Sequence, residues 1–124
     1  MRQRYVPHRG DVVWLSFPPQ AGHEQRGRPF GCAQGRRPAL VLSPAAYNGK
    51  VGLALFCPIT SQIKGYPFEV VLPAGLAVNG VVLSDQVKNL DWRARHAEYA
   101  GRLPAAQVLE VLAKLGTLLS EAEA

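Results

Sequence analysis

Arg37–Ser43, Arg-Pro-Ala-Leu-Val-Leu-Ser, and Val51–Pro58, Val-Gly-Leu-Ala-Leu-Phe-Cys-Pro, are the two stretches that decide the fold. Each run is short and apolar and ends at or beside a proline, which is typical of a buried β-strand. Polar residues stand at their outer ends, with Arg37 opening the first run and Thr60 following the second. Strands that present a cation and a hydroxyl beside loops form a rigid support for a functional site.

Further short strands are expected on both sides of this pair. They are Asp11–Phe17, Phe68–Leu72, Val81–Leu83 and shorter strands within Val87–Trp92 and Tyr99–Leu103. Between the two deciding runs, Tyr47-Asn48-Gly49 is expected to form a turn, because Asn-Gly tolerates positive φ. Short strands separated by Gly and Pro predict a mainly β domain with a small, strongly bent sheet or barrel.

The chain is expected to end in a helix over residues 104–119. Pro104 suits the first turn of a helix, where a missing N–H costs nothing. An apolar stripe follows at helical spacing, formed by Val108, Val111, Leu112, Leu115, Leu118 and Leu119. We expect the stripe to pack on the sheet rather than to bind a membrane or a cofactor.

Length and composition limit the possible classes. The 124 residues fit one domain, and 48% hydrophobic with 19% charged residues is typical of a folded chain. No apolar run of about 18 residues is present to span a bilayer, and no apolar signal segment follows the basic start. The two cysteines and three histidines have no ligand spacing, so we expect no metal, no cofactor and a cytoplasmic location.

The net charge of +5 is unevenly distributed. Residues 1–37 hold seven arginines against two acids, and the rest of the chain is balanced. This asymmetry indicates an electropositive region and a polyanionic partner. Ordinary solvated arginines would give the same count, and the charge alone leaves both readings open.

The order of several blocks resembles the MazF/PemK family of toxin endoribonucleases. The resemblance covers nearly the whole chain except residues 28–35, and its blocks are Gly10–Trp14, Arg37–Pro44, Pro58–Gln62, Lys64–Val70, Val82–Lys88 and Leu90–Arg95. It implies the SH3-like barrel of the MazF/CcdB type, usually a homodimer. It also implies a sequence-specific, ribosome-independent toxin that cleaves single-stranded mRNA and is neutralised by a MazE-like antitoxin.

RNA can be cleaved without a metal, because its own 2′-OH can attack the neighbouring phosphorus and leave a 2′,3′-cyclic phosphate and a 5′-OH. By resemblance, Arg37 is catalytic, and we assign it to transition-state stabilisation because an arginine rarely gives up its proton. The same resemblance places the Thr60 hydroxyl at the scissile phosphate and makes Glu24 a candidate base for the 2′-OH. From sequence alone, a surface arginine is the favoured interpretation of Arg37 and a turn residue that of Thr60, and the resemblance reverses both. The identity of the base stays open.

Base and phosphate recognition is expected from polar residues near these positions. Amides and carboxylates can read single-stranded bases, an aromatic ring can stack, and lysines can meet phosphates. The candidates are His23, Gln25, Gln62, Lys64, Tyr66, Asp85, Gln86 and Lys88, with Asp85-Gln86 matching an acid–glutamine pair of the family. Arg93 and Arg95 add positive charge.

Residues 28–35 depart from the family and are interpreted as a loop insertion. Arg28-Pro29 imitates the Arg37-Pro38 pair, but only the latter leads into an apolar strand. A surface loop can absorb eight residues at small entropic cost, so we expect the insertion to be mobile and removable without loss of folding. Two alternatives to an active nuclease stay open. The insertion could have inactivated a MazF homologue, or the same fold could be a non-catalytic CcdB-like toxin that binds gyrase.

Overall fold

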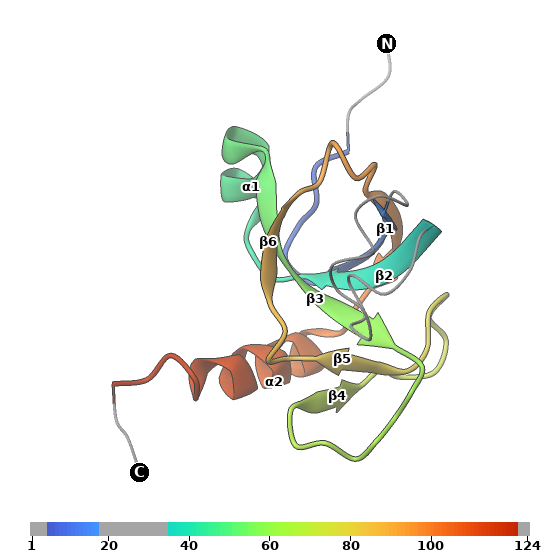
Figure 1. The fold of residues 1–124 in the computed structure, drawn as a ribbon, viewed down its shortest axis with the longest axis vertical. Helices are drawn as coiled ribbons and strands as arrows, with labels where there is room; N and C mark the ends of the chain where they lie inside the picture. The colour runs from blue at the N-terminus through green and yellow to red at the C-terminus, as the bar shows by residue number, and fades with distance from the viewer. Residues whose placement is uncertain (1–4, 18–34, 122–124) are drawn as a thin grey trace.

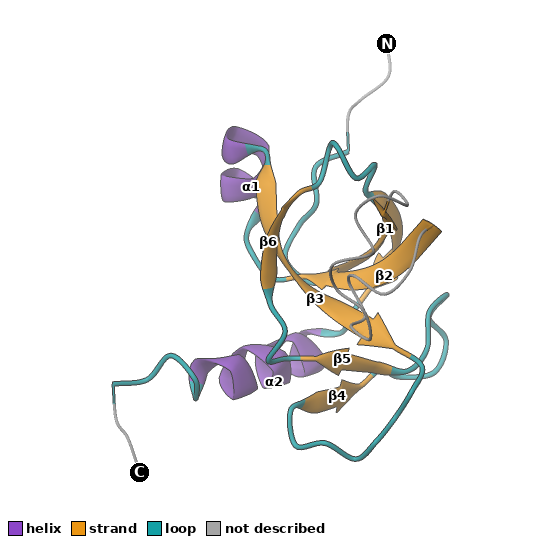
Figure 2. Cartoon of the chain, in the orientation of Figure 1, coloured by secondary structure: helices purple, strands orange, loops and turns teal. Residues whose placement is uncertain are grey.

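The computed structural model describes residues 5–17 and 35–121. Within them the elements follow in the order β1 (Asp11–Phe17), β2 (Gly35–Val41), α1 (Ala45–Val51), β3 (Leu53–Thr60), β4 (Glu69–Val71), β5 (Val81–Leu83), β6 (Lys88–Asp91), β7 (Glu98–Arg102) and α2 (Ala105–Gly116) (Figure 1). The strands form one antiparallel sheet in the order β4-β5-β3-β2-β1-β7, and β6 also pairs with β3 (Figure 2). The predicted mainly β fold, a curled sheet with a C-terminal helix, is confirmed.

Strand β3 produces the curl because it changes partner along one edge. Its first half pairs with β6, whereas Ile59 and Thr60 pair with Val82 and Val81 of β5. The other edge of β3 pairs with β2, in a ladder that runs from Val41 opposite Phe56 to Ala39 opposite Pro58. The end of β3 therefore lies where two parts of the sheet diverge, and this is where loops can frame a site.

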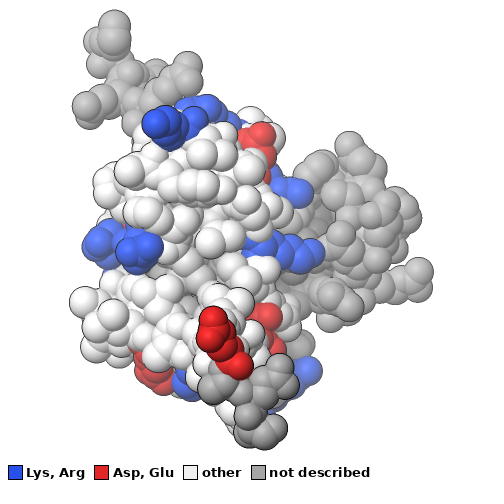
Figure 3. Space-filling model, turned by 90° about the vertical axis from the view of Figure 1, so that its left-hand side faces the viewer, with Lys and Arg blue, Asp and Glu red and all other residues white. Residues whose placement is uncertain are grey.

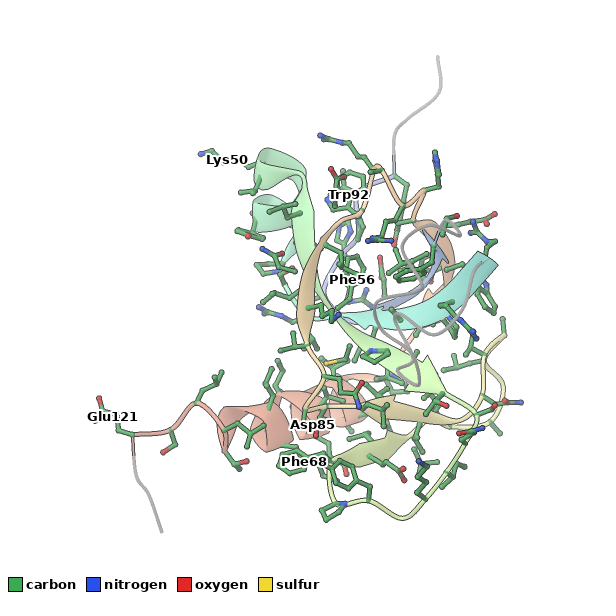
Figure 4. All side chains as sticks on the ribbon, viewed as in Figure 1. Lys50, Phe56, Phe68, Asp85, Trp92 and Glu121 are labelled. Carbon is green, nitrogen blue, oxygen red and sulfur yellow. The ribbon has the colours of Figure 1, made fainter. Side chains whose placement is uncertain are left out.

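Both faces of the central strands are buried, which explains their nearly continuous apolar runs. Along β1, Val12 belongs to a cluster that packs beneath α2, and its neighbour Val13 belongs to a second cluster on the opposite face. The second cluster contains Phe56 and Trp92, which lie toward the interior of the curl (Figure 4). Because successive side chains of a strand point to opposite faces of the sheet, one sheet contributes to two hydrophobic cores.

Helix α1 replaces the turn expected at Tyr47-Asn48-Gly49, and this prediction was wrong. Asn48 is fully buried, and its Nδ2 donates hydrogen bonds to the carbonyls of Pro7 at 2.8 Å and Ser43 at 3.0 Å. The Trp92 indole donates to the Asn48 carbonyl at 2.9 Å. The positive φ occurs instead at Gly52, which ends the helix with φ of 84°, so β3 begins two residues later than expected.

Helix α2 is shorter than the expected 104–119. It begins after Pro104 and ends at Gly116. The helix crosses beneath the sheet beside β4 and β5, and the chain that follows leads away from the body (Figure 1). Leu118 and Leu119 lie past its end and remain 54% and 75% exposed, so the last third of the expected stripe does not pack on the sheet.

Two strand boundaries bear on the site. Strand β2 begins at Gly35, which pairs with Phe17 of β1, so one residue of the expected insertion belongs to the sheet. Arg37 consequently lies inside β2 and not at its first position. Residues 28–34 of the insertion lie outside the described residues, so its expected mobility stays a prediction.

Candidate functional site

A pocket of about 400 Å³ opens at the end of β3. The described residues that line it are Thr60, Gln62, Lys64, Tyr66, Glu69, Leu83 and Gln86. Five of them are candidates from the sequence, and Gln86 joins the others only through the pairing of β5 with β3 and β4. Glu69 and Leu83 were missed, because an acid and a leucine have no evident role in binding a polyanion.

Thr60 lines this pocket and is held in place by its neighbours. As the last residue of β3 it pairs with Val81, and its Oγ1 accepts a hydrogen bond from the N–H of Gln62 at 3.1 Å. A Cβ at Gly80 would lie 2.2 Å from the Thr60 carbonyl oxygen, so only glycine allows this close approach. A hydroxyl that accepts one bond keeps its proton, and Thr60 can still donate to a ligand.

Tyr66 and Asp85 connect the two sides of the pocket. The phenol of Tyr66 donates to Asp85 Oδ2 at 2.6 Å, and its ring lies 5.8 Å from that of Phe68. Asp85 and Phe68 lie close together beside β4 and β5, toward α2 (Figure 4). The hydrogen bond to Asp85 raises the pKa of Tyr66, so the phenol holds its proton more tightly than an ordinary tyrosine.

Arg37 lies on the neighbouring strand. In the β2–β3 ladder Ala39 pairs with Pro58, so Arg37, two residues before Ala39, and Thr60, two residues after Pro58, stand at the same end of the pair. Arg37 is not among the described residues that line the pocket. Lys88 lies farther along, opposite Phe56 in the β3–β6 ladder.

The remaining sequence candidates divide into two groups. His23, Glu24 and Gln25 lie outside the described residues. Arg93 and Arg95 pack their guanidinium groups over the rings of Trp92 and Phe17, at 4.6 and 4.5 Å from the ring centroids. These two arginines are therefore engaged in aromatic contacts.

Charge is dispersed on the one face of the molecule that Figure 3 shows. Lysine and arginine side chains stand in separate groups, with uncharged surface between them, on the face in Figure 3. No group of three His, Cys, Asp or Glu residues that could hold a metal occurs among residues 5–17 and 35–121. The expected electropositive region is thus not evident on this face, and four of the seven N-terminal arginines lie in the parts of the chain that are not described.

Comparison with known protein families shows to which family this chain belongs. The model of the PemK-like, MazF-like toxins of type II toxin–antitoxin systems matches residues 8–119. The chain belongs to this family. The fold of the whole described chain also matches that of MazF. Among residues 5–17 and 35–121, no helix is long and apolar enough to cross a membrane.

Individual relatives agree with this membership. The chain is 46% identical to the endoribonuclease toxin MazF of Escherichia coli K12 over 96% of its length and 99% of that protein. It is 35% identical to the endoribonuclease PemK of Escherichia coli, over 97% of this chain and 87% of that protein. The structure of MazE-MazF from Deinococcus radiodurans matches with a TM-score of 0.83 and 58% identity, covering 96% of this chain and all of the matched chain.

Proposed function

We propose that this MazF-like chain is a sequence-specific toxin that cleaves single-stranded mRNA without a ribosome or a metal ion. It is an endoribonuclease, as its relatives of 46% and 35% identity are named. The observation that carries the proposal is the pocket at the end of β3, where the Thr60 hydroxyl is surrounded by amides, a lysine and a phenol. Arg37 stands at the same end of the adjacent strand.

The chemistry uses the nucleophile that RNA contains. The 2′-OH gives its proton to a base, for which Glu24 is the candidate, and its oxygen bonds to phosphorus. The P–O5′ bond breaks, and the 5′ oxygen takes up a proton, leaving a 2′,3′-cyclic phosphate and a 5′-OH. Arg37 and Thr60 stabilise the charge on the phosphoryl oxygens, and DNA, which lacks the 2′-OH, is not cut.

Recognition of the RNA sequence falls to the walls of the pocket. The amides of Gln62 and Gln86 hydrogen-bond to base edges, and the ring of Tyr66 stacks on a base. Lys64 contacts a phosphate. Asp85 acts in recognition by holding the Tyr66 phenol, because its other carboxylate oxygen, Oδ1, is buried. Lys88, His23 and Gln25 contact the flanking RNA.

Partners follow from the family and the surface. A MazE-like antitoxin with an acidic, flexible segment neutralises the toxin, and the related MazE-MazF structure supports such a complex. The toxin acts as a homodimer, for which the exposed Leu118 and Leu119 offer apolar surface. Because its substrate is mRNA, it acts in the cytoplasm.

The test is cleavage of a defined single-stranded transcript in EDTA, with both new ends mapped. We expect the wild-type protein to cut at a short recurring sequence and to leave cyclic phosphate and 5′-OH ends. Arg37→Ala should lower kcat by about 100- to 1000-fold, whereas Arg93→Ala, which removes an equal charge from the Trp92 ring, should cut normally. EDTA-sensitive cleavage or full activity of Arg37→Ala would contradict the mechanism, and gyrase inhibition without cleavage would favour the CcdB-like alternative.

A further inference from the structure

Glu69 closes the loop that forms one wall of the pocket. This acid is the first residue of β4, and the loop of residues 61–68 that precedes it carries Gln62, Lys64 and Tyr66. Its Oε2 accepts the N–H of Lys64 at 3.0 Å, and its Oε1 accepts the N–H of Gly65 at 3.0 Å. One carboxylate therefore binds two consecutive backbone amides of the loop.

The backbone of Glu69 adds two further contacts. Its N–H donates to the Tyr66 carbonyl at 3.0 Å, and its carbonyl accepts the Nζ of Lys114 from α2, also at 3.0 Å. Gly65 has φ of +78°, a conformation that glycine adopts readily. All four contacts meet at one residue, so the geometry of the loop depends on Glu69.

This arrangement matters for function because the loop carries three of the residues that line the pocket. Gln62 and Lys64 point from a segment without strand or helix, and such a segment is free to move unless its backbone is bound. Hydrogen bonds from backbone amides to a carboxylate are stronger than those between neutral groups. A rigid loop lets side chains meet an RNA without the entropic cost of ordering them.

We propose that Glu69 is a positioning residue of the RNA pocket, which holds Gln62, Lys64 and Tyr66 in the arrangement that binds RNA around Thr60. This inference rests on the proposed function. It assigns to an acid in the pocket a task other than contact with the polyanion. Lys114 extends the same support to α2, because it fixes the Glu69 carbonyl from below.

A role for Glu69 as the general base is less consistent with its contacts. Both carboxylate oxygens already accept hydrogen bonds from backbone amides. Taking up a proton from the 2′-OH would require at least one of them to break. The contacts suit a carboxylate that holds the loop and does not itself take part in proton transfer.

The experiment compares Glu69→Ala and Glu69→Gln with Glu121→Gln, a control that removes one exposed negative charge near the C-terminus. Three quantities are measured on full-length protein: amide hydrogen exchange at Lys64 and Gly65, affinity for an oligonucleotide with a 2′-deoxy group at the cut site, and kcat and KM on the cleavable RNA. In Glu69→Ala we expect exchange and the dissociation constant to rise about tenfold, with kcat changed less than about threefold and its pH profile unaltered. Glu69→Gln should fall between it and the wild type, because an amide oxygen can replace only one of the two acceptors.

Wild-type affinity and exchange in folded Glu69→Ala would overturn the proposal. A loss of kcat above about 100-fold with a changed pH profile would also overturn it, in favour of a catalytic role. If Glu69→Ala does not fold, Glu69→Gln decides: intermediate affinity supports the proposal and wild-type affinity ends it. A wild-type protein that binds the RNA but does not cut it refutes the proposed nuclease, while the exchange and affinity measurements still test Glu69, and one that binds no RNA refutes both.

Discussion

Tyr66 donates a hydrogen bond of 2.6 Å to Asp85, and this contact joins the loop before β4 to the segment between β5 and β6. The two residues are 19 positions apart in the chain. The phenol is thereby fixed at the edge of the pocket, and one oxygen of the carboxylate is occupied. Because the other oxygen of Asp85, Oδ1, is buried, the bond chiefly determines how the Tyr66 phenol is presented to a ligand.

Removing the Tyr66 hydroxyl should weaken RNA binding without affecting the chemical step. In Tyr66→Phe the ring can still stack, but Asp85 loses its orienting donor, so we expect the dissociation constant to rise about three- to tenfold. Fluorescence anisotropy with an uncleavable oligonucleotide measures this. Tyr47→Phe, a matched change on α1 outside the pocket, should bind as the wild type does, and equal affinities of all three proteins would contradict the prediction.

The hydroxyl of Thr60, rather than its shape, is expected to matter for cleavage. Thr60→Val keeps the branched side chain in β3 but cannot donate, and kcat should fall by about 10- to 100-fold. Thr60→Ser keeps the donor and should retain most activity. Single-turnover cleavage of a defined RNA distinguishes them, and similar rates for the valine and serine variants would show that the hydroxyl has no part in the reaction.

Tyr5 should make stability depend on pH in the alkaline range. Its phenol donates to the buried carboxylate of Asp11 at 2.6 Å, and burial, followed by this hydrogen bond, raises the pKa of Tyr5 well above 10. The folded protein therefore holds the proton more tightly than the unfolded chain, so this stabilisation is complete below pH 10 and declines as the pH rises above it. Tyr5→Phe should lower the free energy of unfolding by about 1–2 kcal/mol at pH 7.

Urea unfolding at pH 7, 9 and 11 provides the measurement. The wild type should lose more stability than Tyr5→Phe between pH 9 and 11. Tyr99→Phe serves as the control. It keeps the edge-on contact between the rings of residues 5 and 99, whose centroids are 6.0 Å apart. Parallel losses in wild type and Tyr5→Phe would disprove the assignment.

Cys57 should be inert in the folded protein. Its side chain is fully buried in β3, and burial raises the pKa of its thiol to about 12. In a Cys32→Ser background, a thiol reagent at pH 8 should label Cys57 only at the rate of unfolding and promptly in denaturant. Fast labelling under native conditions would show that this part of β3 opens readily.

Local patterns predicted most of the fold but not α1. Strands β1 and β5 have the bounds that their apolar runs indicate, because alternation and flanking Gly or Pro act within a few residues. Asn48-Gly49 reads as a turn on the same local grounds. Its helical state depends on contacts of Asn48 with Pro7 and Trp92, 41 and 44 residues away, which no local pattern contains.

The candidate site shows the same division. Thr60, Gln62, Lys64 and Tyr66 are close in sequence, and their grouping follows from a single loop. Gln86 reaches the same pocket only because β5 pairs with both β3 and β4. The role of Glu69 was missed because its partners are backbone amides, and nothing in a sequence marks which amides a carboxylate will accept.

The sequence by itself determined the mainly β class, the C-terminal helix, the family and most of the residue types at the pocket, because these depend on local composition and on motifs in a fixed order. Only the tertiary structure decided that Asn48 lies in a helix, that Glu69 closes the loop and that Leu118 and Leu119 remain exposed. The physical reason is that hydrogen bonding and burial between distant segments depend on how the sheet curls, and that curl arises where β3 exchanges β6 for β5.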